Sequence, residues 1–142
     1  MLSTLTIATS KKRQLVDITN QVEKIVYQSK AKEGCVLIFA RHTTCSIVIT
    51  EVEDNLETDI IRYLEKEGPK GPFGHNHGDI LAHDPRHADK SHTPSHILSA
   101  IIGQSTLIPI DNGQLLLGTW QRICVLELDG PRIRKVIMRI SQ

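Results

Sequence analysis

Short runs that are apolar or alternate between apolar and polar residues recur along the whole chain, and this pattern constrains the fold more than any other feature. Such runs are typical of strands that place one face on a core. Turn-forming residues separate them, so we expect antiparallel pairing: a hairpin from the first two runs and a meander from the last four. The runs are Leu2–Thr9, Gln14–Thr19, Val36–Arg41, Ser46–Val52, Thr106–Ile110, Leu115–Leu117, Ile123–Leu128 and Ile133–Ile140.

Three other segments carry helical periodicity, each with a start signal and a stop signal. The signals are Asn20/Glu23 with Gly34, Asp54/Glu57 with Gly68-Pro69, and Thr93-Pro94 with Gly103. Strands in separate runs with a few short helices predict an α+β fold, with an antiparallel or mixed, sandwich-like sheet core and about three helices.

Length and charge limit the classes of function. The chain has 142 residues and a formal net charge of +1, which fits one domain over residues 1–142 and gives no field that would attract nucleic acid or an anionic membrane. No apolar run is long enough to span a bilayer and no secretion signal opens the sequence, so we expect a cytoplasmic protein. Cys35, Cys45 and Cys124 lie in strand-like runs without metal-binding spacing, and we expect them to be core residues.

Histidines gather in one segment. Six of the seven lie from His75 to His96, largely within a long stretch, Pro69 to His92, that shows no periodicity. Imidazole is the commonest metal ligand, so metal binding is the first interpretation. The alternative is a solvated loop in which histidines such as His83 and His87 do nothing.

Three of these histidines flank elements that can hold them still, namely His75, His92 and His96. His96 falls in the first turn of a predicted helix, whose positive end disfavours protonation of the imidazole. We therefore expect these three to bind a divalent metal, zinc first and magnesium as the alternative, and to leave one position open. The same helix end could bind a phosphate with help from Thr93 and Ser95.

Polar residues also stand at the ends of apolar runs. His42, Thr43 and Thr44 follow one strand, where His42 is either a site residue or a satisfied core histidine. Glu127 interrupts the apolar run Val125–Leu128, which is unusual for a carboxylate. Arg132 follows a turn and could hold phosphate, although an exposed hairpin rim would look the same.

The chain resembles the YjbQ-like family, whose members are described as secondary thiamine-phosphate synthases. The resemblance rests on motifs spread over nearly the whole chain. They are His42-Thr43-Thr44-Cys45-Ser46, Glu51–Asp54, His75, Thr93-Pro94-Ser95-His96-Ile97 running to Gly103, Gly118-Thr119-Trp120-Gln121, and Glu127 with Gly130-Pro131-Arg132. The chain departs from the family pattern at Val52, Asn55 and His92 and in the length of the histidine-rich segment.

This resemblance implies a homotrimer with a histidine metal site near the subunit boundary. It also implies a reaction that joins a pyrimidine diphosphate to a thiazole phosphate and releases pyrophosphate. Together with the residue chemistry it predicts catalytic roles for His42, Glu127, Trp120 and Gln121, binding of a phosphorylated substrate by Thr43, Thr44, Thr93, Ser95 and Arg132, and metal binding by His75, His92 and His96. Two alternatives stay open: a non-catalytic metal-binding trimer and a metal-dependent hydrolase.

Overall fold

Two antiparallel sheets form the protein, whose structure is a computed structural model that describes residues 1–75 and 92–142. The larger sheet has the strand order β1 (Leu2–Ala8), β8 (Ile133–Ser141), β3 (Gly34–Ala40), β5 (Ser105–Asp111) and β6 (Gln114–Leu115). The smaller sheet has the order β2 (Gln14–Asp17), β7 (Arg122–Glu127) and β4 (Cys45–Thr50). The α+β class and the positions of the predicted strands are confirmed.

The predicted pairing was wrong in two places. The first two strands do not form a hairpin, because β1 pairs with β8 in the larger sheet and β2 pairs with β7 in the smaller one. The last four strands do not form a meander either, because only β5 and β6 pair with each other and β7 lies in the other sheet. Turn chemistry marks where a strand ends, but it does not decide which sheet the next strand joins.

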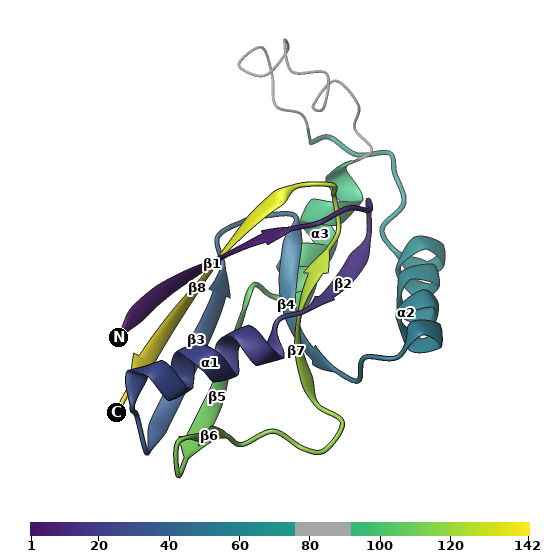
Figure 1. Cartoon of the computed structure of the whole chain (residues 1–142). Coiled ribbons are helices and arrows are strands. Elements are labelled where there is room, and N and C mark those ends of the chain that lie inside the picture. The colour runs from purple at the N-terminus through teal and green to yellow at the C-terminus, as the bar shows by residue number, and fades with distance from the viewer. Residues whose placement is uncertain (76–91) are drawn as a thin grey trace.

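The core lies between the two sheets and under α1 (Thr19–Ser29), which covers them on one side (Figure 1). Val36 and Ile38 of the larger sheet and Ile123 and Val125 of the smaller sheet have no exposed surface. Such burial of β-branched residues from both sheets gives the sandwich-like arrangement that the alternating pattern predicts.

The ends of α1 differ from the prediction. Asp17 accepts hydrogen bonds from the backbone N–H and the hydroxyl of Thr19, at 2.8 and 2.6 Å, and so takes the place of the expected Asn20/Glu23 box. The helix stops at Lys30, whose φ of 59° is left-handed, before the expected stop at Gly34.

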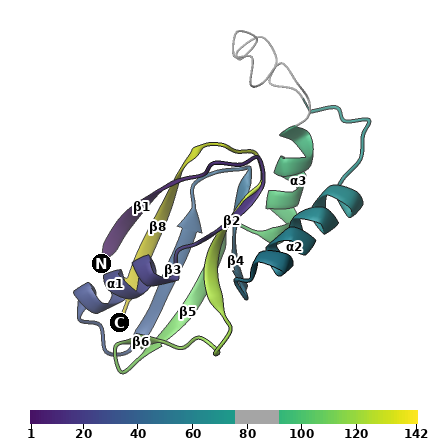
Figure 2. The same ribbon diagram turned by 45° about the vertical axis from the view of Figure 1, so that its right-hand side comes forward.

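Two helices, α2 (Asp54–Glu67) and α3 (Thr93–Ile102), lie beside the smaller sheet and away from α1 (Figure 2). Leu98 of α3 and Leu64 of α2 pack with Leu126 and Leu128 in a second apolar cluster. This cluster fixes α3 against the sheet, and the first turn of α3 carries two of the predicted metal ligands. Within the described residues, no helix is long and apolar enough to cross a membrane.

Two of the three cysteines are buried, as expected, and Cys35 is half-exposed. Burial raises the pKa of Cys45 to about 11 and that of Cys124 to about 12, so neither thiol ionises near neutral pH. The remaining histidines of the rich segment, His77, His83 and His87, lie outside the described residues.

Candidate metal centre

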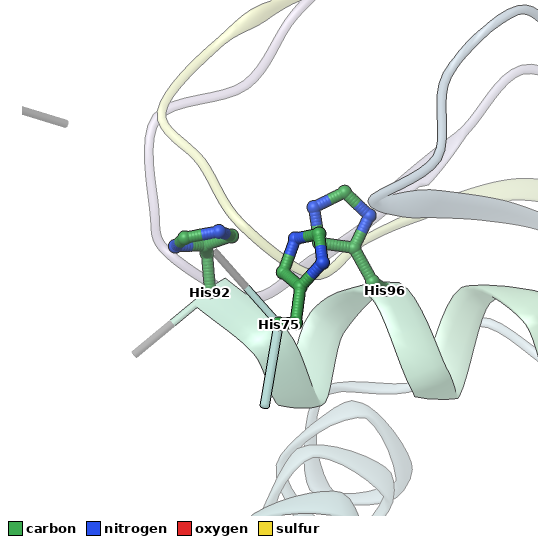
Figure 3. A group of neighbouring side chains, drawn as sticks. All are labelled: His75, His92 and His96. Carbon is green, nitrogen blue, oxygen red and sulfur yellow. The ribbon is translucent and has the colours of Figure 1, made fainter. Parts of the chain in front are cut away.

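His75, His92 and His96 converge at the N-terminal end of α3 (Figure 3). Their ligand atoms all lie within 4.8 Å of one another. The ring centroids are 5.4 Å apart for His75 and His92, 4.9 Å for His75 and His96, and 5.4 Å for His92 and His96. The sequence prediction named this same group.

Helix geometry explains two of the three positions. His92 directly precedes α3 and His96 lies four residues later, so both side chains fall on one side of the first helical turn. Two serines hold this helix in place: Ser95 Oγ donates to the Leu128 carbonyl at 2.6 Å, and Ser99 Oγ donates to the Cys45 carbonyl at 2.8 Å. His75 reaches the same point from the segment that follows α2.

The donor set fits a zinc ion. In a tetrahedral site with Zn–N bonds of about 2.0–2.1 Å, the ligand nitrogens are about 3.3 Å apart, so the three rings, whose ligand atoms lie within 4.8 Å of one another, would draw closer on binding. Three imidazoles leave the fourth position for water or substrate, which is the pattern of catalytic zinc sites. Magnesium fits less well, because it prefers oxygen ligands.

A cleft of about 870 Å³ adjoins two of the three histidines. Its lining includes His92 and His96 together with four residues that the sequence predicted for substrate or catalysis: His42, Thr43, Thr44 and Arg132. The other lining residues are Thr9, Arg41, Asp129, Pro131, Ile133 and Arg134. Of these, Arg41 and Thr9 were missed, although Arg41 directly precedes the polar motif at the end of β3.

Glu127 lies behind the cleft and has no exposed surface. Its carboxylate pairs with the Arg134 guanidinium and accepts the backbone N–H groups of Leu128 and Asp129 and the Thr9 hydroxyl, at 2.9, 2.8 and 2.9 Å. Burial alone would raise the pKa of Glu127, but these hydrogen bonds outweigh burial and the pKa is lowered. Glu127 is therefore a fixed anion that positions Arg134.

Arg134 in turn positions the wall of the cleft. Its guanidinium donates to the Thr44 hydroxyl at 3.0 Å and to the Thr44 carbonyl at 3.2 Å. Burial would lower the pKa of Arg134, but the hydrogen bond to Glu127 and the negative charges around the guanidinium together outweigh burial and raise the pKa, so Arg134 stays a cation. Thr44 is thereby held at the start of β4, facing the cleft that it lines.

His42 also lines the cleft and is half-buried after β3. Its Nε2 accepts the backbone N–H of Lys135 at 2.8 Å. Burial lowers the pKa of His42, and the nearby charge of Arg134 lowers it further, so the neutral ring dominates at pH 7.

The remaining predicted residues lie elsewhere. Trp120 is 71% exposed and precedes β7, whose far end carries Glu127, so strand geometry puts the two roughly 20 Å apart. Gln121 accepts the Gly118 backbone N–H through Oε1 at 2.8 Å. Within one chain neither residue lines the cleft, and their catalytic role stays a prediction.

Ser95 and Thr93 occupy the start of α3 as predicted, but they do not line the large cleft. The Ser95 hydroxyl donates to the Leu128 carbonyl. Thr93 lines a smaller pocket of about 360 Å³ together with Phe73, His75 and His96. Their predicted binding of phosphate also stays a prediction.

Comparison with known proteins identifies the family. The model of the family described as UPF0047 protein YjbQ-like matches residues 3–142. The chain belongs to this family. A UPF0047 protein of Archaeoglobus fulgidus is 39% identical over 135 residues, which cover 95% of this chain and 97% of that protein. UPF0047 protein YugU of Bacillus subtilis is 33% identical, covering 99% of this chain and 98% of that protein.

Solved structures of UPF0047 relatives share the fold. A YbjQ-like protein of unknown function from Sulfolobus solfataricus matches with a TM-score of 0.82 and 35% identity, over 99% of this chain and 95% of the other. An uncharacterized family member from Clostridium acetobutylicum matches with a TM-score of 0.83 and 35% identity, over 98% and 99%. The UPF0047 relatives therefore establish family and fold, and the site geometry must carry the argument about function.

The buried pair behind the cleft makes a testable prediction for this UPF0047 protein. Glu127→Gln keeps the shape of the side chain but leaves the Arg134 charge buried without its partner, which we expect to lower the free energy of unfolding by about 3–5 kcal/mol at pH 7. Denaturant unfolding measures this change. Asp129→Asn, which alters the more exposed pair with Arg132, is the matched control and should cost at most about 1 kcal/mol.

Unfolding measurements at acidic pH provide the second part of this test. Because the pKa of folded Glu127 is lowered, the carboxylate stabilises the wild type above the unfolded value, and this contribution is lost as the pH falls through the folded pKa. The difference between wild type and Glu127→Gln should therefore shrink in acid. A constant difference from neutral pH into acid would contradict the assignment of Glu127 as a fixed anion.

Proposed function

We propose that this UPF0047 protein is a zinc-dependent transferase that joins a pyrimidine diphosphate to a thiazole phosphate. The observation that carries the proposal is the convergence of His75, His92 and His96 beside a cleft that contains arginine and hydroxyl groups. The resemblance to proteins described as secondary thiamine-phosphate synthases supplies the substrate class.

The cleft suits a phosphorylated substrate. Arg41 and Arg132 both line it, and Arg41 is exposed. The Arg132 guanidinium is oriented by Asp129, through its Nε on the Asp129 carbonyl at 2.7 Å and a second nitrogen on the carboxylate at 2.6 Å. A preoriented guanidinium matches the paired oxygens of a phosphate group.

The reaction breaks the bond between the pyrimidine methylene carbon and the diphosphate oxygen, and a thiazole nitrogen forms the new bond to that carbon. The pyrophosphate that leaves keeps the electron pair. Bound zinc would supply a Lewis acid that stabilises the negative charge on the leaving oxygens. Arg41 and Arg132 would offset the same charge, while Thr43 and Thr44 offer hydroxyl groups to the phosphate oxygens.

Zinc affinity tests the metal site. In the double variant His75→Ala, His96→Ala one imidazole remains, so we expect the dissociation constant for zinc to rise by about 100-fold or more, measured by competition with a chelator dye. His83→Ala, His87→Ala removes two histidines from outside the triad and is the matched control, with unchanged affinity expected. Equal zinc affinity in wild type and the triad variant would refute the site.

Turnover tests the reaction. Wild-type protein loaded with zinc should form thiamine phosphate and pyrophosphate from the two precursors, and chelator should abolish this activity. Arg132→Ala should retain zinc but lose activity by about 10-fold or more, since it removes a charged donor to the leaving group. Tight zinc binding without turnover would instead favour the non-catalytic metal-binding protein.

A homotrimer is part of the proposal. The outer face of the larger sheet, opposite the core, carries exposed apolar side chains. Leu37 and Leu107 are paired neighbours on this face, 38% and 62% exposed, and Phe39, 41% exposed, is paired with Ile137 of β8. A contiguous apolar patch that is exposed on the surface of one subunit is typical of a surface that binds another protein chain.

Light scattering should therefore give three times the chain mass of 15.9 kDa at micromolar concentration. Leu107→Glu places a charge on the apolar face and should shift the protein to monomer without unfolding it, because the side chain is already largely exposed. Tyr63→Glu, at a 67% exposed position on α2, should leave the trimer intact. A monomeric wild type would rule the trimer out.

A further inference from the structure

We propose that His42 serves the cleft as an uncharged hydrogen-bond donor through Nδ1, while the backbone of β8 occupies its other ring nitrogen. The tautomer of His42 is inferred only from contacts within this chain. The group that accepts the hydrogen bond from Nδ1, an oxygen of a diphosphate or similar anion, is inferred from the proposed function. In a histidine without such a backbone contact, either ring nitrogen could accept a proton as a base. In this arrangement the ring nitrogen that remains available to a ligand can only donate a hydrogen bond.

The backbone of Lys135 decides the tautomer. Its carbonyl accepts the Arg41 N–H at 3.2 Å, which continues the pairing of β3 with β8 by one residue. Its N–H then donates to His42 Nε2 at 2.8 Å, where a regular ladder would have used a backbone carbonyl. The imidazole thus completes the end of the sheet.

A backbone amide can only donate, so the nitrogen that receives it must carry a lone pair. Nε2 of His42 is therefore unprotonated, and the single proton of the neutral ring resides on Nδ1. Protonating the ring would require breaking the hydrogen bond to Lys135. The backbone N–H of Lys135 thereby selects one tautomer of His42 and disfavours protonation of the ring.

The surrounding charges act in the same direction. Arg134, Arg132 and Arg41 all disfavour a positive charge on His42, whereas Glu127, which is already paired with Arg134, favours it. Burial is the largest cause that lowers the pKa of His42, and the charges of the three arginines lower it further. A neutral ring persists at pH 7 beside an anion-binding wall.

Nδ1 is the polar atom that His42 can offer to a ligand. Among the described residues it has no hydrogen-bond partner, and His42 lines the same cleft as His92 and His96. A neutral N–H donor next to arginines and a metal can stabilise negative charge on a leaving oxygen without first losing or gaining a proton. His42 is accordingly assigned to anion binding and not to general base catalysis.

Nuclear magnetic resonance tests the tautomer without any ligand. In metal-free wild-type protein labelled with ¹⁵N, long-range proton–nitrogen correlations should show Nδ1 of His42 protonated and Nε2 unprotonated at pH 7. Adding pyrophosphate to the zinc-loaded protein should then shift the Nδ1 resonance. An Nε2–H tautomer, a mixture of the two tautomers, a charged ring, or an Nδ1 resonance that ignores pyrophosphate would overturn the assignment.

Two substitutions separate the donor from the ring. His42→Asn places an amide N–H close to the position of Nδ1 and should keep pyrophosphate affinity near that of the wild type. His42→Leu removes the donor and should weaken pyrophosphate binding by about 10-fold or more, the loss expected for a hydrogen bond to a charged group. Equal affinity in His42→Leu and wild type, with both proteins folded by thermal unfolding, would overturn the donor role.

The zinc site and the donor role of His42 can be refuted independently of each other. A protein that takes up no zinc, yet binds pyrophosphate with the same dependence on His42, would refute the metal site and leave the donor standing. A zinc-binding protein whose His42 carries its proton on Nε2 would refute the donor and leave the metal site standing.

Discussion

The buried pair of Glu127 and Arg134 joins the two halves of the structure. Glu127 ends β7 in the smaller sheet and Arg134 lies in β8 of the larger sheet, so one charge-assisted contact connects the sheets at the edge where the cleft opens. The pair also engages Thr9 and Thr44, which lie near the ends of two further strands. A buried ion pair of this kind contributes little net free energy compared with an apolar pair, but its geometry is demanding. Here that geometry fixes the relative position of the strand ends that make the site.

The candidate metal centre depends on how the two sheets are held relative to each other. The smaller sheet anchors α3 through Ser95, Ser99 and the leucine cluster, and α3 then presents His92 and His96 on one side of its first turn. The larger sheet contributes the arginine and histidine wall from the ends of β3 and β8. The metal ligands on α3 are therefore held by the smaller sheet, whereas Arg41, His42 and Arg132 lie at strand ends of the larger sheet, so the relative position of the two sheets decides the geometry of the site.

Local patterns predicted the elements and much of the site, whereas long-range pairing lay beyond them. Period-two runs located the strands, and the density of histidines together with a helix start identified His75, His92 and His96. The two-sheet topology could not be read from the turns, because β1 and β2 are consecutive but join different sheets. The role of Glu127 was also hidden, since a carboxylate in an apolar run looks the same whether it serves catalysis or an ion pair. Its partner, seven residues later in sequence, became evident only in the structure.

The central claim is that three imidazoles hold a zinc ion with an open position beside an anion-binding cleft. X-ray absorption at the zinc edge measures this directly on the zinc-loaded protein in solution. The account predicts three nitrogen neighbours at about 2.0–2.1 Å with at least one exchangeable oxygen, and replacement or shift of that oxygen when pyrophosphate is added. A shell with sulfur ligands, a shell of oxygen alone, or a closed four-nitrogen shell that does not respond to pyrophosphate would contradict it.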